Sequence, residues 1–197
     1  MPLDDAHIMQ RVQDGQFELF DELVLRYRGP LLRVAESKLG ERAWAEDVVQ
    51  ETFLAVFAAR HTFDQRFAFR TWLWTILLNL CRRQLKRARR TPRQWTRSAL
   101  ASSPERVPEP ASPETGLTQA LLLERSRLVA ALLDELPEPQ ADALRLRFYG
   151  GLKFEEIAET MHSSRSAAKQ RVRKGLLALG ERLKNDDQLR DDVEETT

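Results

Sequence analysis

The sequence predicts an all-α protein of two small helical domains joined by a linker rich in proline and serine. Apolar residues recur at three- and four-residue spacing from Ile8 onward, and no segment shows sustained two-residue alternation bounded by hairpin turns. Five prolines interrupt this pattern between residues 91 and 116. A chain of 197 residues that is 42% hydrophobic can bury a core in each half.

The first domain is expected over residues 1–90. An apolar stripe from Phe17 to Val34 predicts a helix, and Gly40 supplies its stop, because glycine suits the left-handed end of a helix. A second helix is expected over about 43–60, followed by a loop at 61–68. A long helix then starts near Phe69 and runs into a basic segment. Apolar residues surround its first half on nearly all sides, which predicts a central position among other helices.

The linker is assigned to residues 91–116, where prolines block helix formation and withhold backbone donors. Helical periodicity resumes at Leu117. We expect helices near 117–135, 138–148, 154–161 and 164–184, which makes residues 117–184 the second domain. Residues 185–197 form an acidic tail.

Charge and composition narrow the function classes. The net charge is only +1, but eight basic residues and no acid lie between Arg82 and Arg97, which favours a nucleic-acid partner for that segment. The single cysteine, Cys81, cannot form an internal disulfide and fits a reducing cytoplasm. The N-terminus lacks the features of a signal peptide, and the longest apolar stretch is about half of what a membrane span needs, so we expect no membrane span.

An enzyme is disfavoured. The three histidines, His7, His61 and His162, are scattered, and the chain has neither a phosphate-cradling glycine loop nor a metal-ligand cluster. We therefore expect no catalytic residues, no metal and no cofactor.

The segment from Phe154 to Leu179 has the layout of a helix-turn-helix, with Ser164 as the N-cap of its second helix. The spacing predicts that one side of this helix faces the core and another faces outward. The inward residues are Ala168, Val172, Leu176 and Leu179, and the outward ones are Ser166, Lys169, Gln170 and Arg173. Such side chains can read base edges in a major groove, although an ordinary solvated helix face is the alternative.

Two further stretches are candidates for binding. On the second helix, Asp47, Gln50, Glu51 and Leu54 form an outer stripe that either docks a basic helical partner or is simply solvated. The loop and the basic helix after it combine cations with aromatic rings, a mixture used to bind single-stranded DNA. For Trp72 and Trp74 a core position is the better interpretation.

The order of these segments resembles the extracytoplasmic-function (ECF) sigma factors of the sigma-70 family. Four segments of the first domain resemble region 2 of that family: Leu19-Phe-Asp-Glu-Leu, Tyr27-Arg-Gly-Pro-Leu-Leu, Ala45-Glu-Asp-Val-Val-Gln-Glu-Thr-Phe and Thr71-Trp-Leu-Trp. Region 4 resembles Leu136-Pro-Glu, Leu144-Arg-Leu-Arg-Phe, Glu155-Glu-Ile-Ala-Glu and Lys169-Gln-Arg-Val. The resemblance covers nearly the whole chain outside the linker and the tail. It implies a factor that directs core RNA polymerase to promoters and helps to melt them.

The resemblance also implies roles for particular residues. The residues implied in docking core polymerase are Asp47, Gln50, Glu51 and Leu54, which match positions that bind the clamp helices of the beta-prime subunit. Those implied in minus-ten DNA binding are Thr62, Phe63, Asp64, Gln65, Arg66, Phe67, Trp72, Arg82, Arg83 and Lys86, and the loop would capture a flipped base. Those implied in minus-thirty-five DNA binding are Arg165, Ser166, Lys169, Gln170, Arg173 and Lys174. The implied partners are core polymerase, through its beta-prime and beta subunits, and promoter DNA; an anti-sigma factor is left open.

Some residues depart from the family pattern. His162 replaces the usual turn glycine, Ser163 the usual apolar residue after it, and Ala168 a larger apolar residue, so looser packing of region 4 is expected. Phe67 stands where small polar residues are frequent, so the family's base preference does not carry over. A stand-alone helix-turn-helix regulator is the remaining alternative, and it would have no need of the stripe that starts at Asp47.

Overall fold

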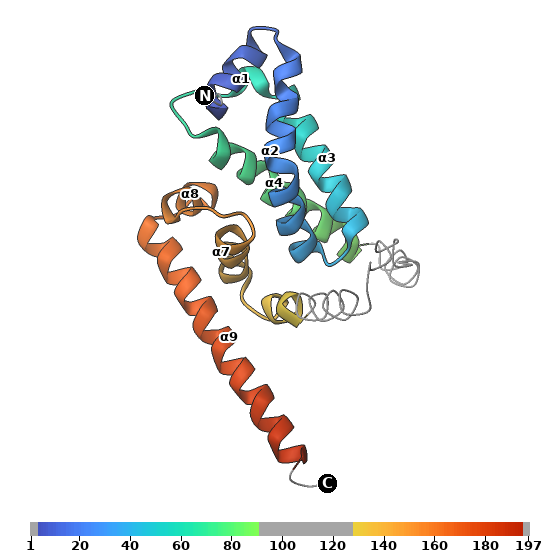
Figure 1. Cartoon of the computed structure of the whole chain (residues 1–197), viewed down its shortest axis with the longest axis vertical. Coiled ribbons are helices and arrows are strands. Elements are labelled where there is room, and N and C mark those ends of the chain that lie inside the picture. The colour runs from blue at the N-terminus through green and yellow to red at the C-terminus, as the bar shows by residue number, and fades with distance from the viewer. Residues whose placement is uncertain (1–3, 91–127, 195–197) are drawn as a thin grey trace, which may run out of the picture.

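The computed structural model describes residues 4–90 and 128–194, which form two helical units (Figure 1). The labelled elements are α1 (Asp5–Gln13), η1 (Phe17–Leu19), α2 (Phe20–Leu39), α3 (Arg42–Ala58), η2 (Arg60–Thr62), α4 (Phe69–Arg90), α7 (Glu138–Phe148), α8 (Phe154–Thr160) and α9 (Arg165–Glu194). Every regular element in the described ranges is helical, which confirms the all-α class. The segment predicted as the linker, and residues 117–127 of the helix expected after it, lie outside these ranges; residues 128–134 are helical.

In the N-terminal unit, α4 is the central helix, as predicted. It contacts α1, α2 and α3, and its side chains Leu73, Trp74 and Leu77 are fully buried. Gly40 ends α2 as expected, because its φ of 72° is left-handed and its N–H donates to the Glu36 carbonyl oxygen at 2.9 Å. The expected start of α4 at Phe69 is also correct.

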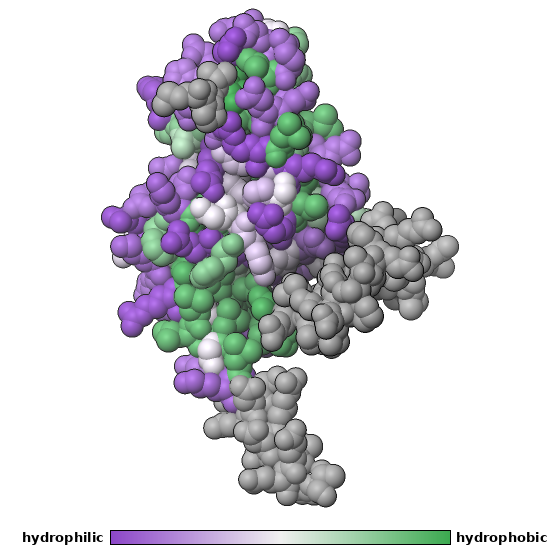
Figure 2. Space-filling view, viewed as in Figure 1, coloured by the Kyte–Doolittle hydropathy of each residue, from purple (hydrophilic) through white to green (hydrophobic). Residues whose placement is uncertain are grey.

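In the C-terminal unit, α7 and α8 occupy the segments expected to be helical, whereas α9 extends past the predicted end at residue 184 to Glu194. The backbone of the acidic segment up to Glu194 therefore continues the last helix, which projects away from the rest of the molecule (Figure 1). Figure 2 shows a hydrophobic area on the lower part of the coloured surface, above the atoms drawn in grey. Among the α9 residues whose side chains the structure describes, the exposed leucines are Leu176, Leu177 and Leu183.

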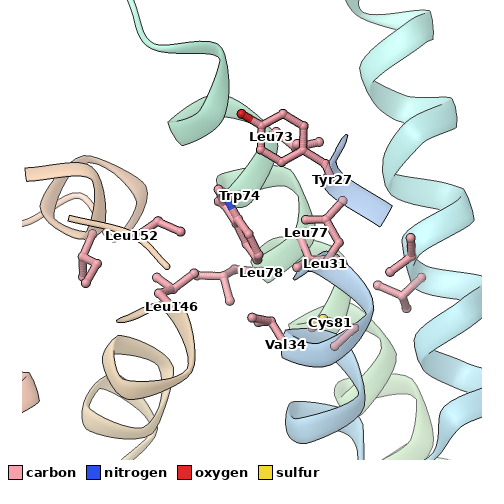
Figure 3. Close-up of a cluster of buried hydrophobic side chains, with 14 of the residues drawn as sticks. Tyr27, Leu31, Val34, Leu73, Trp74, Leu77, Leu78, Cys81, Leu146 and Leu152 are labelled. Atoms are coloured by element: carbon pink, nitrogen blue, oxygen red, sulfur yellow. The ribbon is translucent and has the colours of Figure 1, made fainter. Parts of the chain in front are cut away.

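The two units meet around Trp74, whose side chain is fully buried, and the close-up shows Leu146 and Leu152 of the C-terminal unit facing Trp74 and Leu78 of α4 (Figure 3). Glycine is required at position 150, because a Cβ there would lie 2.8 Å from the Leu146 carbonyl oxygen and 3.1 Å from the Trp74 ring. One continuous hydrophobic core thus spans both units.

Candidate nucleic-acid and protein-binding surfaces

The outer stripe of α3 borders a groove between α2 and α3. Asp47, Gln50, Glu51 and Leu54 are all exposed, as the spacing predicted. The groove has a volume of about 600 Å³, and its apolar lining includes Phe20, Phe53 and Phe57. Asp47, Gln50 and Leu54 line it as well, whereas Glu51 lies outside it and pairs with Arg83 of α4. An apolar groove with acidic residues at its rim suits an amphipathic, basic helix.

The loop from η2 to α4 has a buried stem and an exposed tip. The Phe63 ring is only 7% exposed and packs against Trp72 and Phe69, with ring centroids 5.3 and 5.7 Å away. The ring of Phe63 is part of the core in this arrangement, so a contact between Phe63 and DNA stays a prediction that requires the ring to leave this packing. At the tip Phe67 is 64% exposed, which leaves it as the ring available for stacking.

The other loop residues predicted to contact minus-ten DNA are polar. Thr62, Gln65 and Arg66 are exposed. The Arg66 guanidinium donates to the Asp64 carboxylate at 2.5–3.1 Å, and the Arg66 N–H donates to the same group at 2.9 Å. These hydrogen bonds lower the pKa of Asp64, so the carboxylate stays ionised beside the cation. An approaching phosphate would compete with Asp64 for Arg66.

Along α4, the two tryptophans belong to the core, as the sequence interpretation favoured. Trp74 is fully buried and Trp72 is half-buried against the Phe63 ring. Trp72 was also among the predicted minus-ten residues, and this packing leaves only part of it accessible. Of the predicted basic contacts, Lys86 is exposed, whereas Arg82 and Arg83 are exposed but engaged by carboxylates.

A buried cluster of charges joins the two units where Arg82 is held. The Lys38 ammonium, on α2, donates to Asp142 Oδ1 at 2.6 Å and to Glu138 Oε1 at 2.9 Å. Arg82 donates to Asp142 Oδ2 at 3.1 Å, and Arg145 Nη1 lies 3.8 Å from Asp142 Oδ1. The side chains of Lys38 and Asp142 are 2% and 0% exposed. Burying two opposite charges is tolerated only because each is paired.

Two further contacts strengthen this junction. Arg70 of α4 donates to the carbonyl oxygens of Gly150 and Gly151, at 2.7 and 3.1 Å, beyond the end of α7. The Lys38–Glu138 hydrogen bond described above lowers the pKa of Glu138, so the Glu138 carboxylate is held in its charged form.

The helix-turn-helix forms as predicted. His162 occupies the turn with a φ of 48°, and the Ala167 N–H donates to Ser164 Oγ at 3.1 Å, which confirms the N-cap. All six residues predicted to contact minus-thirty-five DNA are exposed on α9: Arg165, Ser166, Lys169, Gln170, Arg173 and Lys174. Arg165 pairs with Glu155 at 2.5 Å, and the Lys169 ammonium lies 5.8 Å from the Phe154 ring centroid.

The inward face of α9 corrects one prediction. Ala168 and Val172 are buried as expected, but Leu176 is 47% exposed. The buried position is Gly175, where a Cβ would lie 2.7 Å from Leu144 Cδ1 of α7. α9 and α7 approach closely at Gly175, where a Cβ would require the Leu144 side chain to shift, and it is position 175 rather than Leu176 that faces α7.

The sequence interpretation missed two residues that join the two units. Lys38 follows Leu31, Val34 and Ala35 at core-facing spacing, and a lysine in such a register is a sign of a buried ion pair. Asp142 carries a similar sign, since it is an acid among the apolar residues Ala141, Ala143 and Leu144, in the buried run of α7. The residues described by the structure contain no group of three or more His, Cys, Asp or Glu side chains arranged to hold a metal. None of the described helices is long and apolar enough to cross a membrane.

Comparison with known proteins places both units in one family. Residues 23–91 match the model for sigma-70 region 2, and residues 126–179 match that for sigma-70 region 4. The RNA polymerase sigma-H factor of Pseudomonas aeruginosa is 31% identical over 172 residues, which cover 85% of this chain and 88% of the relative. The ECF RNA polymerase sigma-E factor of Escherichia coli is 30% identical over 174 residues, which cover 86% of this chain and 89% of the relative.

A solved structure agrees at the level of the fold. RpoE of Bartonella quintana, crystallised with the anti-sigma factor NepR, superimposes with a TM-score of 0.59 at 24% identity, over 84% of this chain and 96% of that one. Both matched segments occur in the expected order and coincide with the helical units that carry the exposed stripe and the helix-turn-helix. The chain therefore belongs to the ECF group of the sigma-70 family and is an RNA polymerase sigma factor.

Proposed function

We propose that the chain, acting in the cytoplasm as a non-enzymatic initiation factor, docks core polymerase through the α3 stripe. The observation that carries this proposal is the groove between α2 and α3, which places Asp47, Gln50 and Leu54 beside an apolar lining. Polar atoms at the rim and buried apolar area beneath them are the usual make-up of a protein interface. A basic helix of the beta-prime subunit would bury its apolar side in the groove and meet Asp47 at the edge.

The minus-ten function is proposed for the loop tip and for the basic face of α4. Phe67 supplies an exposed ring on which a flipped base can stack, and Arg66 and Lys86 supply cations for the phosphates. Arg82 joins them only after it leaves Asp142, because the same guanidinium cannot bind the carboxylate and a phosphate equally well. Full engagement of melted DNA by Arg82 therefore requires the ion pair between Arg82 and Asp142 to break.

The minus-thirty-five function is proposed for the exposed face of α9. Arg173 can donate two hydrogen bonds to a guanine edge, and Gln170 can donate one to an adenine edge and accept one from it, whereas Lys174 and Arg165 flank that face and suit phosphates. The RpoE structure contains an anti-sigma factor. By that analogy we include a protein of this kind among the partners of this chain.

Charge reversal on the α3 stripe tests the proposed function. We expect the double variant Asp47→Lys, Glu51→Lys to lose co-purification with core polymerase while its helical content stays native. Its matched control reverses two exposed acids outside the groove, Asp14→Lys and Glu18→Lys, and should bind core normally. Equal co-purification of both double variants would refute the docking assignment.

A further inference from the structure

The segment that matches region 2 begins at residue 23, so helix α1 lies before it in the sequence. Helix α1 is nevertheless firmly packed against that segment. Ile8, Met9 and Val12 are fully buried in the core of the N-terminal unit. The Tyr27 hydroxyl donates to the Asp5 carboxylate, which ties the start of α1 to α2. The helix is therefore a fixed platform beside the loop that leads into α4.

The last residue of this platform reaches the loop directly. Gln13 Nε2 donates to the Arg60 carbonyl oxygen at 2.7 Å and to the Phe63 carbonyl oxygen at 3.0 Å. An amide nitrogen carries two hydrogens, and both are used here. The two acceptors lie at the start of η2 and just after its end, so one side chain holds the whole turn.

The loop is thus fixed at Phe63 from two sides. Gln13 holds the backbone of Phe63 from α1, and Trp72 and Phe69 of α4 hold its ring. The exposed tip, including Arg66 and Phe67, begins immediately after this point. The direction in which the tip leaves the domain is therefore set by the two fastenings on Phe63.

We infer that Gln13 is a positioning residue for minus-ten recognition. Its amide sets where the loop tip stands relative to α4, and thereby which base the tip accepts. The inference rests on the proposed function of the loop. It assigns to α1 a part in promoter selectivity at the minus-ten element.

The test compares two substitutions on the same helix. Gln13→Met keeps the length of the side chain, adds no charge and removes both donors, and Gln10→Met makes the same change at an exposed position of α1. Each variant is assembled with core polymerase and selected on one promoter library randomised across the minus-ten element and another randomised across the minus-thirty-five element. Discrimination is a ratio measured on assembled holoenzyme, so a smaller yield of folded protein does not alter it.

We expect Gln13→Met to lower base discrimination at the minus-ten element by about tenfold, within the range that two neutral hydrogen bonds can span. Its discrimination at minus-thirty-five should equal that of Gln10→Met. Gln13→Glu, which places a carboxylate against two carbonyl oxygens, should lower minus-ten discrimination at least as far. If Gln13→Met discriminates at minus-ten as well as Gln10→Met does, the inference is wrong.

Alanine variants at the loop tip distinguish the role inferred for Gln13 from the proposed role of the loop in minus-ten recognition. If Arg66→Ala and Phe67→Ala lose minus-ten discrimination while Gln13→Met keeps it, only the role of Gln13 fails. If the two tip variants also keep full discrimination, the loop does not read the minus-ten element and both assignments fail.

Discussion

Replacing Asp142 with asparagine should release the two helical units from one another. Asp142 is the fully buried carboxylate that accepts hydrogen bonds from Lys38 and Arg82 of the N-terminal unit. Asparagine preserves the shape of the side chain but removes its charge. Among the residues that the structure describes, the buried Lys38 ammonium then retains only Glu138 as a charged partner.

The expected magnitude follows from this geometry. Removing one partner of a buried ion pair costs about 3–5 kcal/mol, because the remaining charge is left in a poorly solvated position. Glu138, whose side chain is 56% exposed, still binds Lys38, so the lower end of that range applies. A cost of about 3 kcal/mol to the closed arrangement raises the ratio of open to closed molecules by about a hundredfold.

Cys81 provides the assay, since it is the one cysteine of the chain. Its buried thiol lies near Lys38, Asp142, Arg145 and Arg82, and burial raises its pKa to about 12. Alkylation at neutral pH therefore requires a motion that exposes this thiol, and we expect separation of the two units to supply it. We expect Asp142→Asn to be alkylated about a hundredfold faster than the parent chain, with native helical content.

The control is Glu138→Gln, which removes a largely exposed carboxylate from the same cluster. An exposed ion pair contributes about 0–1 kcal/mol, so this change should accelerate alkylation by about fivefold at most. If Asp142→Asn and Glu138→Gln label Cys81 at the same rate, the buried pair does not hold the two units together.

Three further predictions concern particular residues. Gln170→Ala and Arg173→Ala should each cost about 1–3 kcal/mol and relax the preference at one base of the minus-thirty-five element, measured on a randomised promoter library; a uniform loss across all sequences would make α9 an electrostatic anchor. Gly175→Ala should destabilise the C-terminal unit by about 1–3 kcal/mol in thermal unfolding, because its Cβ would overlap Leu144, and an unchanged midpoint would refute that close packing. The pKa of Glu138 is depressed, so its contribution to the closed arrangement is complete above its ordinary pKa of 4.5 and is lost as the pH falls through the lower pKa of the folded chain. The rate of Cys81 labelling, corrected for the thiolate fraction, should therefore rise at acid pH. The Glu138→Gln variant should not show this acid-dependent rise.

The helices could be predicted from the sequence because their signals are local. The apolar period of α2, its stop at Gly40 and the N-cap at Ser164 each depend on residues a few positions apart. The exposed stripe on α3 and the outward face of α9 follow from the same spacing, since a helix with one buried side must present the other.

What the sequence did not reveal depends on contacts between distant segments. Phe63 resembled the neighbouring Phe67 in the loop, and only the packing on Trp72 distinguishes a buried ring from an exposed one. Leu176 fits the apolar period of α9, but it is position 175 rather than Leu176 that faces α7. The hydrogen bonds of Gln13 span about fifty residues, and a periodicity argument has no access to such pairs.

Run-off transcription with core polymerase on genomic fragments tests the central claim most directly. The account predicts that the parent chain and the control carrying Asp14→Lys and Glu18→Lys start transcripts at the same defined sites, and that the variant carrying Asp47→Lys and Glu51→Lys starts none. Transcripts that do not depend on the added chain, together with a mobility shift of duplex DNA that is equally strong with and without core polymerase, would contradict it.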